Sequence, residues 1–242
     1  MSGMTRRELF ASFAAAALPR RSFAARVFDS GGVTLPYRIA SPAVRRRAKY
    51  PLVLWLHGGG GRGTDTRAQL AEGNSRGAHV WLRAACYVVA PQCPKGVMWS
   101  TIDTVDPRPH LLAAAELVDE LQRTLPIDPS RVSVAGQSMG GFATWALLAH
   151  FPGRFAAGVP VCGGGNPSRA AAIARTSVWA FHGALDEAVP VERSRVMVEA
   201  VRRAGGTVRY TEYPDVAHDS WTPTFADPRL VPWVLAQRKE RG

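Results

Sequence analysis

The sequence has no apolar stretch long enough to cross a membrane. Its 242 residues contain no run of the roughly 20 apolar residues that a transmembrane helix needs. Internal repeats and low-complexity tracts are also lacking. Hydrophobic residues make up 46% of the chain, which allows a sizeable core and excludes wholesale disorder. This length and composition predict one globular domain and no stable membrane anchor.

Lysine is scarce. It occurs only at Lys49, Lys95 and Lys239, so arginine supplies nearly all of the excess that gives a formal net charge of +11. The basic residues are scattered, and the longest basic run covers residues 45–47. Neither a zinc-finger spacing nor an RNA-binding aromatic motif accompanies them. Net charge by itself concerns solubility and electrostatic steering, so we expect no nucleic-acid partner.

Cysteine is scarce as well. The three cysteines, Cys86, Cys93 and Cys162, allow at most one internal disulfide, and the sequence does not choose among the three possible pairings. Cys86 and Cys162 lie in apolar, strand-like contexts that are typical of buried thiols. No cysteine occupies an early position of the kind that receives a lipid anchor.

The first 25 residues resemble a twin-arginine export signal. Arg6 and Arg7 precede an apolar stretch over residues 9–18, and residues 22–24 form a small-x-small cleavage site. We therefore expect a signal segment over 1–25, one domain over 26–242, and export to the periplasm or beyond. The alternative is an N-terminal helix that is never removed, which would leave the protein in the cytoplasm.

Apolar runs typical of buried strands alternate with helical patterns along the rest of the chain. A β-hairpin is expected over 26–40. Strands are expected over 51–56, 86–90, 132–135, 155–161, 178–181 and 207–213, and helices over 111–125, 139–150, 191–204 and 228–237. This alternation predicts an α/β fold, with a mostly parallel, doubly wound sheet and helices on both faces. Only about 14 residues separate the strands at 155–161 and 178–181, which leaves no room for a large lid.

The motif with the clearest chemistry is Gly-Gln-Ser-Met-Gly at residues 136–140, between a buried strand and a helix. A sharp strand-to-helix turn needs glycine on both sides and raises the hydroxyl of Ser138 above the sheet edge. Serine is a weak nucleophile until a base takes its proton. We expect His218 to be that base, because it follows the last strand, whereas His150 ends a helix and His182 packs or orients a loop. Asp186, at a strand end between them in chain order, is the expected acid.

Two backbone amides are expected to hold the oxyanion. One belongs to Met139, directly after the nucleophile. The second is expected from the glycine loop after Leu56, at Gly59, with Gly58 as the alternative. Trp99 and Trp221 are interpreted as aromatic pocket walls, with simple packing as the other reading.

Four segments together carry a family resemblance: residues 57–60, 136–141, 182–190 and 217–221. They resemble the esterase branch of the prolyl-oligopeptidase-like, phospholipase/carboxylesterase group of α/β-hydrolases. Dienelactone hydrolases, feruloyl esterases and polyhydroxybutyrate depolymerase-like enzymes are similar. The resemblance covers about residues 50–238 and implies a single-domain α/β-hydrolase fold with the triad Ser138, Asp186 and His218. Dienelactone hydrolases proper use cysteine as nucleophile, where this chain has serine.

The expected function is hydrolysis of carboxylic esters through an acyl-enzyme, without metal or organic cofactor. The substrate is expected to be a small or polymer-linked ester, with Gln137 beside its pocket, and the protein is expected to be a monomer or homodimer. A peptidase or amidase with the same triad is one alternative. A non-catalytic binding module on the same fold is the other.

Overall fold

The computed structural model of the chain describes residues 21–239. Most of the expected signal segment, 1–25, therefore lies outside the described residues. Of its last five residues, Arg21 donates from its guanidinium group to the carbonyl oxygens of Ser41 (2.8 Å) and Ala84, and the ring of Phe23 packs edge-on against that of His79. Arg21 and Phe23 thus contact the domain, upstream of the expected cleavage site.

One sheet runs through the described part of the chain, with eight strands in the order β1-β2-β4-β3-β5-β6-β7-β8. These are β1 (Ala24–Ser30), β2 (Val33–Ala40), β3 (Tyr50–Leu56), β4 (Tyr87–Pro91), β5 (Ile127–Gln137), β6 (Ala157–Val161), β7 (Ser177–Gly183) and β8 (Val208–Tyr213). Strands β3 to β8 are parallel, and β2 runs antiparallel to β1 and β4. Every residue of β3, β4 and β6 is buried, because both faces of the sheet are covered. The predicted doubly wound α/β sheet is confirmed.

The hairpin of β1 and β2 turns at Gly31 and Gly32, whose φ angles are 54° and 82°. Ser30 pairs with Val33 across this two-residue turn. Positive φ at both central residues is typical of the hairpin turn that matches the twist of its strands, and glycine adopts it without steric cost. The predicted hairpin is confirmed, and its first strand begins at Ala24.

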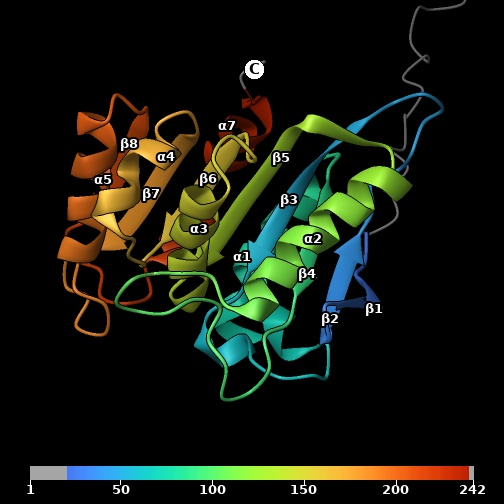
Figure 1. Cartoon of the computed structure of the whole chain (residues 1–242), viewed down its shortest axis with the longest axis horizontal. Helices are drawn as coiled ribbons and strands as arrows, with labels where there is room; N and C mark the ends of the chain where they lie inside the picture. Colours follow the sequence, from blue (N-terminus) through green and yellow to red (C-terminus); the bar gives the residue numbers. More distant parts are fainter. Residues whose placement is uncertain (1–20, 240–242) are drawn as a thin grey trace, which may run out of the picture.

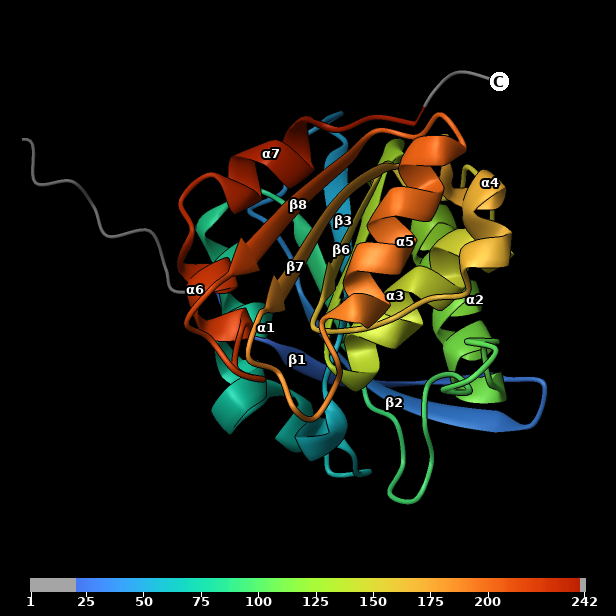
Figure 2. The ribbon, with the colours of Figure 1, turned by 90° about the vertical axis from the view of Figure 1, so that its left-hand side faces the viewer.

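Helices cover both faces of the sheet (Figures 1 and 2). The first layer holds α2 (Pro109–Thr124), α3 (Met139–His150), α4 (Ala170–Ile173) and α5 (Glu192–Arg203); the second holds α1 (Ser75–His79), α6 (Trp221–Ala226) and α7 (Leu230–Ala236). Each helix layer packs on one face of the sheet and buries a separate apolar core. One core contains Trp145 and Met197, and the other contains Trp81 and Phe225. Among residues 21–239, no helix has the length and apolar character needed to cross a bilayer.

The predicted helices α2, α3, α5 and α7 are present, while α1, α4 and α6 and five 3-10 turns were not anticipated. The turns are η1 (Gly59–Gly61), η2 (Ala68–Leu70), η3 (Glu72–Asn74), η4 (Val80–Arg83) and η5 (Pro167–Arg169). Each missed helix has six residues or fewer, which is too short for a helical repeat to be visible in the sequence. The connection from β6 to β7 holds only η5 and α4, as short as predicted.

All three cysteines are buried free thiols in this structure. The one disulfide that the sequence left open is therefore not formed. Burial raises the pKa of the Cys86 thiol to about 11 and those of Cys93 and Cys162 to about 12. A thiol with so high a pKa is almost entirely protonated at neutral pH and is a poor nucleophile.

Candidate active site

The serine predicted as nucleophile lies between β5 and α3, with no residue of loop on either side. Ser138 has φ 53° and ψ −117°, a backbone conformation that few non-glycine residues adopt. Its neighbours leave no space for side chains. A Cβ on Gly136 would lie 2.3 Å from the carbonyl oxygen of Gly140, and one on Gly141 would lie 2.3 Å from that of Val161. The crowded turn thus explains the glycines of the motif, as the sequence predicted.

The loops that carry His218 and Asp186 are held against each other. The Leu185 N–H donates to the Val216 carbonyl oxygen over 3.0 Å. A Cβ on Gly183, at the end of β7, would lie 2.2 Å from that same oxygen, so only glycine permits this approach. The connection after β8 therefore passes directly beside the end of β7, and the imidazole and the carboxylate meet there.

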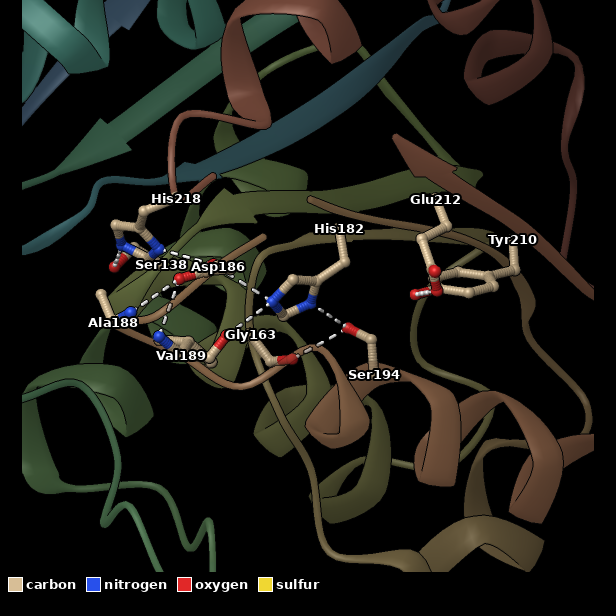
Figure 3. Close-up of polar contacts among 10 residues, drawn as sticks. All are labelled: Ser138, Gly163, His182, Asp186, Ala188, Val189, Ser194, Tyr210, Glu212 and His218. Atoms are coloured by element: carbon tan, nitrogen blue, oxygen red, sulfur yellow. Dashed lines mark hydrogen bonds and ion pairs between the residues drawn. The ribbon is translucent and has the colours of Figure 1, made fainter. Parts of the chain in front are cut away.

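The side chains of Ser138, His218 and Asp186 form one hydrogen-bonded chain (Figure 3). Ser138 Oγ lies 2.9 Å from His218 Nε2, and His218 Nδ1 lies 2.7 Å from Asp186 Oδ2. A carboxylate can only accept, so Nδ1 carries the proton, and Nε2 accepts the bond that the serine hydroxyl donates. The Asp186 side chain is fully buried, whereas that of His218 is 29% exposed. The structure thus brings together all three predicted residues.

The carboxylate of Asp186 has further partners. Its Oδ1 accepts from the backbone N–H groups of Ala188 (3.0 Å) and Val189 (2.9 Å). Its Oδ2 also lies 3.2 Å from Nε2 of His182, a histidine whose ring is fully buried. Burial lowers the pKa of His182, so its ring is neutral at neutral pH. Four donors therefore surround one carboxylate.

The glycine loop after β3 lines the same cavity as Ser138 and His218. The amide of Gly58 donates to Asn74 Oδ1 over 2.9 Å, so it is already engaged. Gly59 begins the short helix η1 and lines both of the cavities that reach Ser138. Of the two glycines considered from the sequence, Gly59 is the better placed to bind an oxyanion. Met139, the other expected donor, is the first residue of α3.

His57 fixes the start of this loop. Its Nε2 accepts from the Cys93 N–H over 3.0 Å, so its Nδ1 carries the proton and donates to the Gly58 carbonyl oxygen over 2.7 Å. Burial lowers the pKa of His57 to about 4. The ring is therefore a neutral, structural group that connects the glycine loop to the chain after β4.

Two cavities meet at Ser138. The first, of about 450 Å³, contains Gln137, His218 and Trp221 in its wall. The second, of about 290 Å³, is lined by Met98, Ile102, Phe142, Val189 and Pro190 together with Arg62 and Arg193. The structure thus places Gln137 and Trp221 beside the serine, where the sequence predicted a pocket.

A model of the phospholipase/carboxylesterase family matches residues 38–228. The chain belongs to this family. A solved thermostable esterase has 39% sequence identity and a TM-score of 0.84, with 90% of this chain and 63% of that chain covered. The fold is therefore that of a single-domain α/β-hydrolase.

Two curated relatives are similar over shorter stretches. Carboxylesterase NlhH of Mycobacterium tuberculosis is 34% identical over 127 residues, which are 51% of this chain and 37% of the relative. Poly(3-hydroxyalkanoate) depolymerase C of Paucimonas lemoignei is 32% identical over 124 residues, 48% of this chain and 28% of the relative. The chain thus spans less than half the length of the curated family relatives it matches.

Trp99 does not take the position predicted for it. Its side chain is fully buried, and its Nε1 donates to the His57 carbonyl oxygen over 3.2 Å. Its ring also packs against the imidazole of His57, with centroids 5.1 Å apart. The expectation that Trp99 walls the substrate pocket is wrong, because the indole packs behind the glycine loop, out of contact with solvent. Trp221 does line the first cavity and packs edge-on against His218.

Several side chains at the site were not identified from the sequence: Asn74, which holds Gly58; Arg62 and Arg193; and Ser194, the partner of His182. None of these four belongs to the motifs. His182 does, and the sequence predicts that it packs or orients a loop. The available signal for His182 was its place at the end of β7, four residues before the predicted acid. The others reach the site through contacts between distant segments, which no local pattern shows.

One group near the site has the residue types of a metal site. Ligand atoms of Cys162, Asp186 and His218 lie within 4.8 Å of one another. Metal binding would need the Cys162 thiolate, and burial holds the pKa of that thiol at about 12. The carboxylate and the imidazole are already bonded to each other. Asp186 and His218 therefore fit the hydrogen-bonded triad with Ser138 better than a metal centre with Cys162.

Proposed function

We propose that this protein is a serine carboxylesterase that cleaves carboxylic esters with Ser138, His218 and Asp186. The observation that carries the proposal is the continuous chain of hydrogen bonds of 2.9 and 2.7 Å from a strained serine to a buried carboxylate. Membership of the phospholipase/carboxylesterase family and the similarity to a solved esterase support it.

The proposed reaction follows from the geometry. His218 Nε2 accepts the proton of Ser138 as Oγ attacks the ester carbonyl carbon. The negative charge that develops on the carbonyl oxygen is stabilised by the amides of Met139 and Gly59, at the N-terminal end of α3 and in the glycine loop. His218 then returns the proton to the departing alcohol oxygen. Water, deprotonated by the same histidine, hydrolyses the acyl-serine and releases the acid.

Asp186 neither gives nor takes a proton in this scheme. It holds the Nδ1–H tautomer of His218 and stabilises the imidazolium that forms when Ser138 attacks. Its complete burial strengthens that interaction, because the surrounding dielectric is low. The two cavities at Ser138 would take the acyl and alcohol parts of the ester, which makes a small ester or an exposed ester group of a polymer the proposed substrate.

The test is turnover by purified protein. Wild type should hydrolyse p-nitrophenyl butyrate and react with a fluorophosphonate probe at a single residue. Ser138→Ala should fold normally yet lose both activities, whereas Ser130→Ala, at the opposite end of β5, should keep them. Faster cleavage of a peptide anilide than of the ester would favour a peptidase. No labelling of folded wild type would favour a binding protein.

A further inference from the structure

We propose that His182 is a positioning residue that holds the carboxylate of Asp186 toward His218, so that its removal lowers the reactivity of Ser138. The inference rests on the proposed function, because it concerns the same triad. The sequence leaves open whether this histidine packs or orients a loop. Its contacts with Val189, Asp186 and Ser194 decide between these roles.

The contacts of His182 Nε2 show which ring nitrogen carries the hydrogen. His182 Nε2 lies 2.9 Å from the Val189 carbonyl oxygen and 3.2 Å from Asp186 Oδ2. Both of these oxygens are acceptors, so Nε2 must carry a hydrogen. His182 therefore donates to the loop of Asp186, and one N–H is shared between the carboxylate and the peptide three residues beyond it.

The opposite side of the ring is anchored to a different element. His182 Nδ1 lies 2.7 Å from Ser194 Oγ on α5, and Ser194 Oγ lies 3.0 Å from the Gly163 carbonyl oxygen after β6 (Figure 3). Ring and hydroxyl are both fully buried. Since the ring is neutral and carries its hydrogen at Nε2, Nδ1 accepts. The single hydroxyl hydrogen of Ser194 then goes to Nδ1, 2.7 Å away, and the Gly163 carbonyl oxygen at 3.0 Å is a second acceptor that competes for it. His182 is thus held at both nitrogens.

The peptide of Val189 links His182 to the second carboxylate oxygen of Asp186. The N–H of Val189 donates to Asp186 Oδ1, and its carbonyl oxygen accepts from His182. His182 therefore contacts the carboxylate directly through Oδ2 and also fixes the peptide that binds Oδ1. A carboxylate held at both oxygens cannot rotate about its terminal bond. That restraint keeps Oδ2 2.7 Å from His218 Nδ1.

Two substitutions separate this role from packing. The amide nitrogen of His182→Gln can reach the place of Nε2 and donate to Asp186, whereas His182→Asn keeps a polar group near Nδ1 only. We expect His182→Asn to lower kcat for p-nitrophenyl butyrate by about tenfold or more with KM nearly unchanged. His182→Gln should recover most of the loss. His150→Asn, on an exposed histidine at the end of α3, is the control and should have no effect.

The decisive measurement is a double-mutant cycle with Asp186→Ala. If His182 acts through Asp186, His182→Asn should cost less than about twofold once the carboxylate is gone. An equal loss in both backgrounds would overturn the proposal, as would His182→Asn lowering only the thermal midpoint. Should His182→Asn fail to fold, Ser194→Ala, which removes the donor to Nδ1, replaces it in the same cycle.

The rate of fluorophosphonate labelling of Ser138 is measured in parallel. This rate reports the reactivity of the serine whatever ester is the natural substrate. A labelled wild type without ester turnover would contradict the proposed function, while slower labelling of His182→Asn alone would still support the positioning role. Equal labelling of wild type and His182→Asn would overturn it.

Discussion

The backbone of Gly140 in α3 lies so close to the carbonyl oxygen of Leu56 in β3 that a Cβ on Gly140 would be 1.9 Å from it. Leu56 ends the strand that leads into the glycine loop, and Gly140 lies two residues after Ser138. The turn that carries the nucleophile is therefore packed, backbone to backbone, on the loop that carries the expected oxyanion donor Gly59.

Gly140→Ala should consequently lower both stability and turnover. The added methyl group would clash with the backbone of Leu56 and His57, which cannot turn aside as a side chain could. Helix α3 or the glycine loop must therefore move, at an overpacking cost of about 1–3 kcal/mol or more. We expect a lower denaturation midpoint in urea and a loss of kcat for p-nitrophenyl butyrate. Gly60→Ala is the stability control, because nothing lies within 4 Å of its Cβ position. Wild-type stability and kcat in Gly140→Ala would contradict the packing.

The three thiols should be unreactive in the native protein. Because Cys86, Cys93 and Cys162 are buried and their pKa values are raised, dithionitrobenzoate should not react with native protein. Three thiols per chain should react after unfolding in guanidinium. A count of one after unfolding without reductant would reveal a disulfide. Activity should be the same with and without dithiothreitol.

Chain order and local chemistry were enough to predict the central residues of the site. Ser138 lies in a glycine-flanked turn, and His218 and Asp186 follow strands whose carboxyl ends meet at one edge of the sheet. The indole of Trp99 was misplaced because an aromatic residue in a long loop has the same pattern whether it packs inward or outward. Its partner, the carbonyl of His57, is 42 residues away.

The same limit explains why Asn74 was missed. Its bond to Gly58 spans 16 residues and arises only when the short helices between β3 and β4 fold over the glycine loop. Such a contact between irregular segments has no sequence period. The sheet, by contrast, was predictable strand by strand, because buried parallel strands appear as continuous apolar runs.

The second cavity should favour esters that carry negative charge. Arg62 and Arg193 line it, and no acidic residue of the described chain does. We expect Arg193→Gln to lower kcat/KM for the p-nitrophenyl monoester of succinic acid by about tenfold, since a lost hydrogen bond to a charged group costs about 1.5–3 kcal/mol. The value for p-nitrophenyl butyrate should hardly change.

The control for this substitution is Arg123→Gln, on an arginine of α2 that pairs with Glu120 outside the cavity. It should affect neither substrate. Added salt should weaken the preference for the charged ester in wild type, because exposed charges are screened. An equal effect of Arg193→Gln on both esters would show that the guanidinium group does not contact the anionic part.

His57 should make the fold less stable in mild acid. The unfolded chain binds a proton at His57 near the ordinary pKa of 6.5, but the native ring does so only near pH 4. Between these values the unfolded state holds more protons, so the free energy of unfolding falls as the pH falls. From pH 7 to pH 5 the contribution of His57 is a loss of about 2 kcal/mol, and it becomes constant below pH 4.

Urea denaturation at pH 7 and pH 5 measures this loss. His182 contributes in the same direction, because burial lowers its pKa as well, so the slope belongs to both histidines in wild type. His57→Gln should be less stable at pH 7 but lose less stability on acidification. Proton NMR of the His57 ring measures its titration midpoint in the native protein directly. A midpoint near pH 6.5 would contradict the burial, because it would mean that the ring and the start of the glycine loop are open to water.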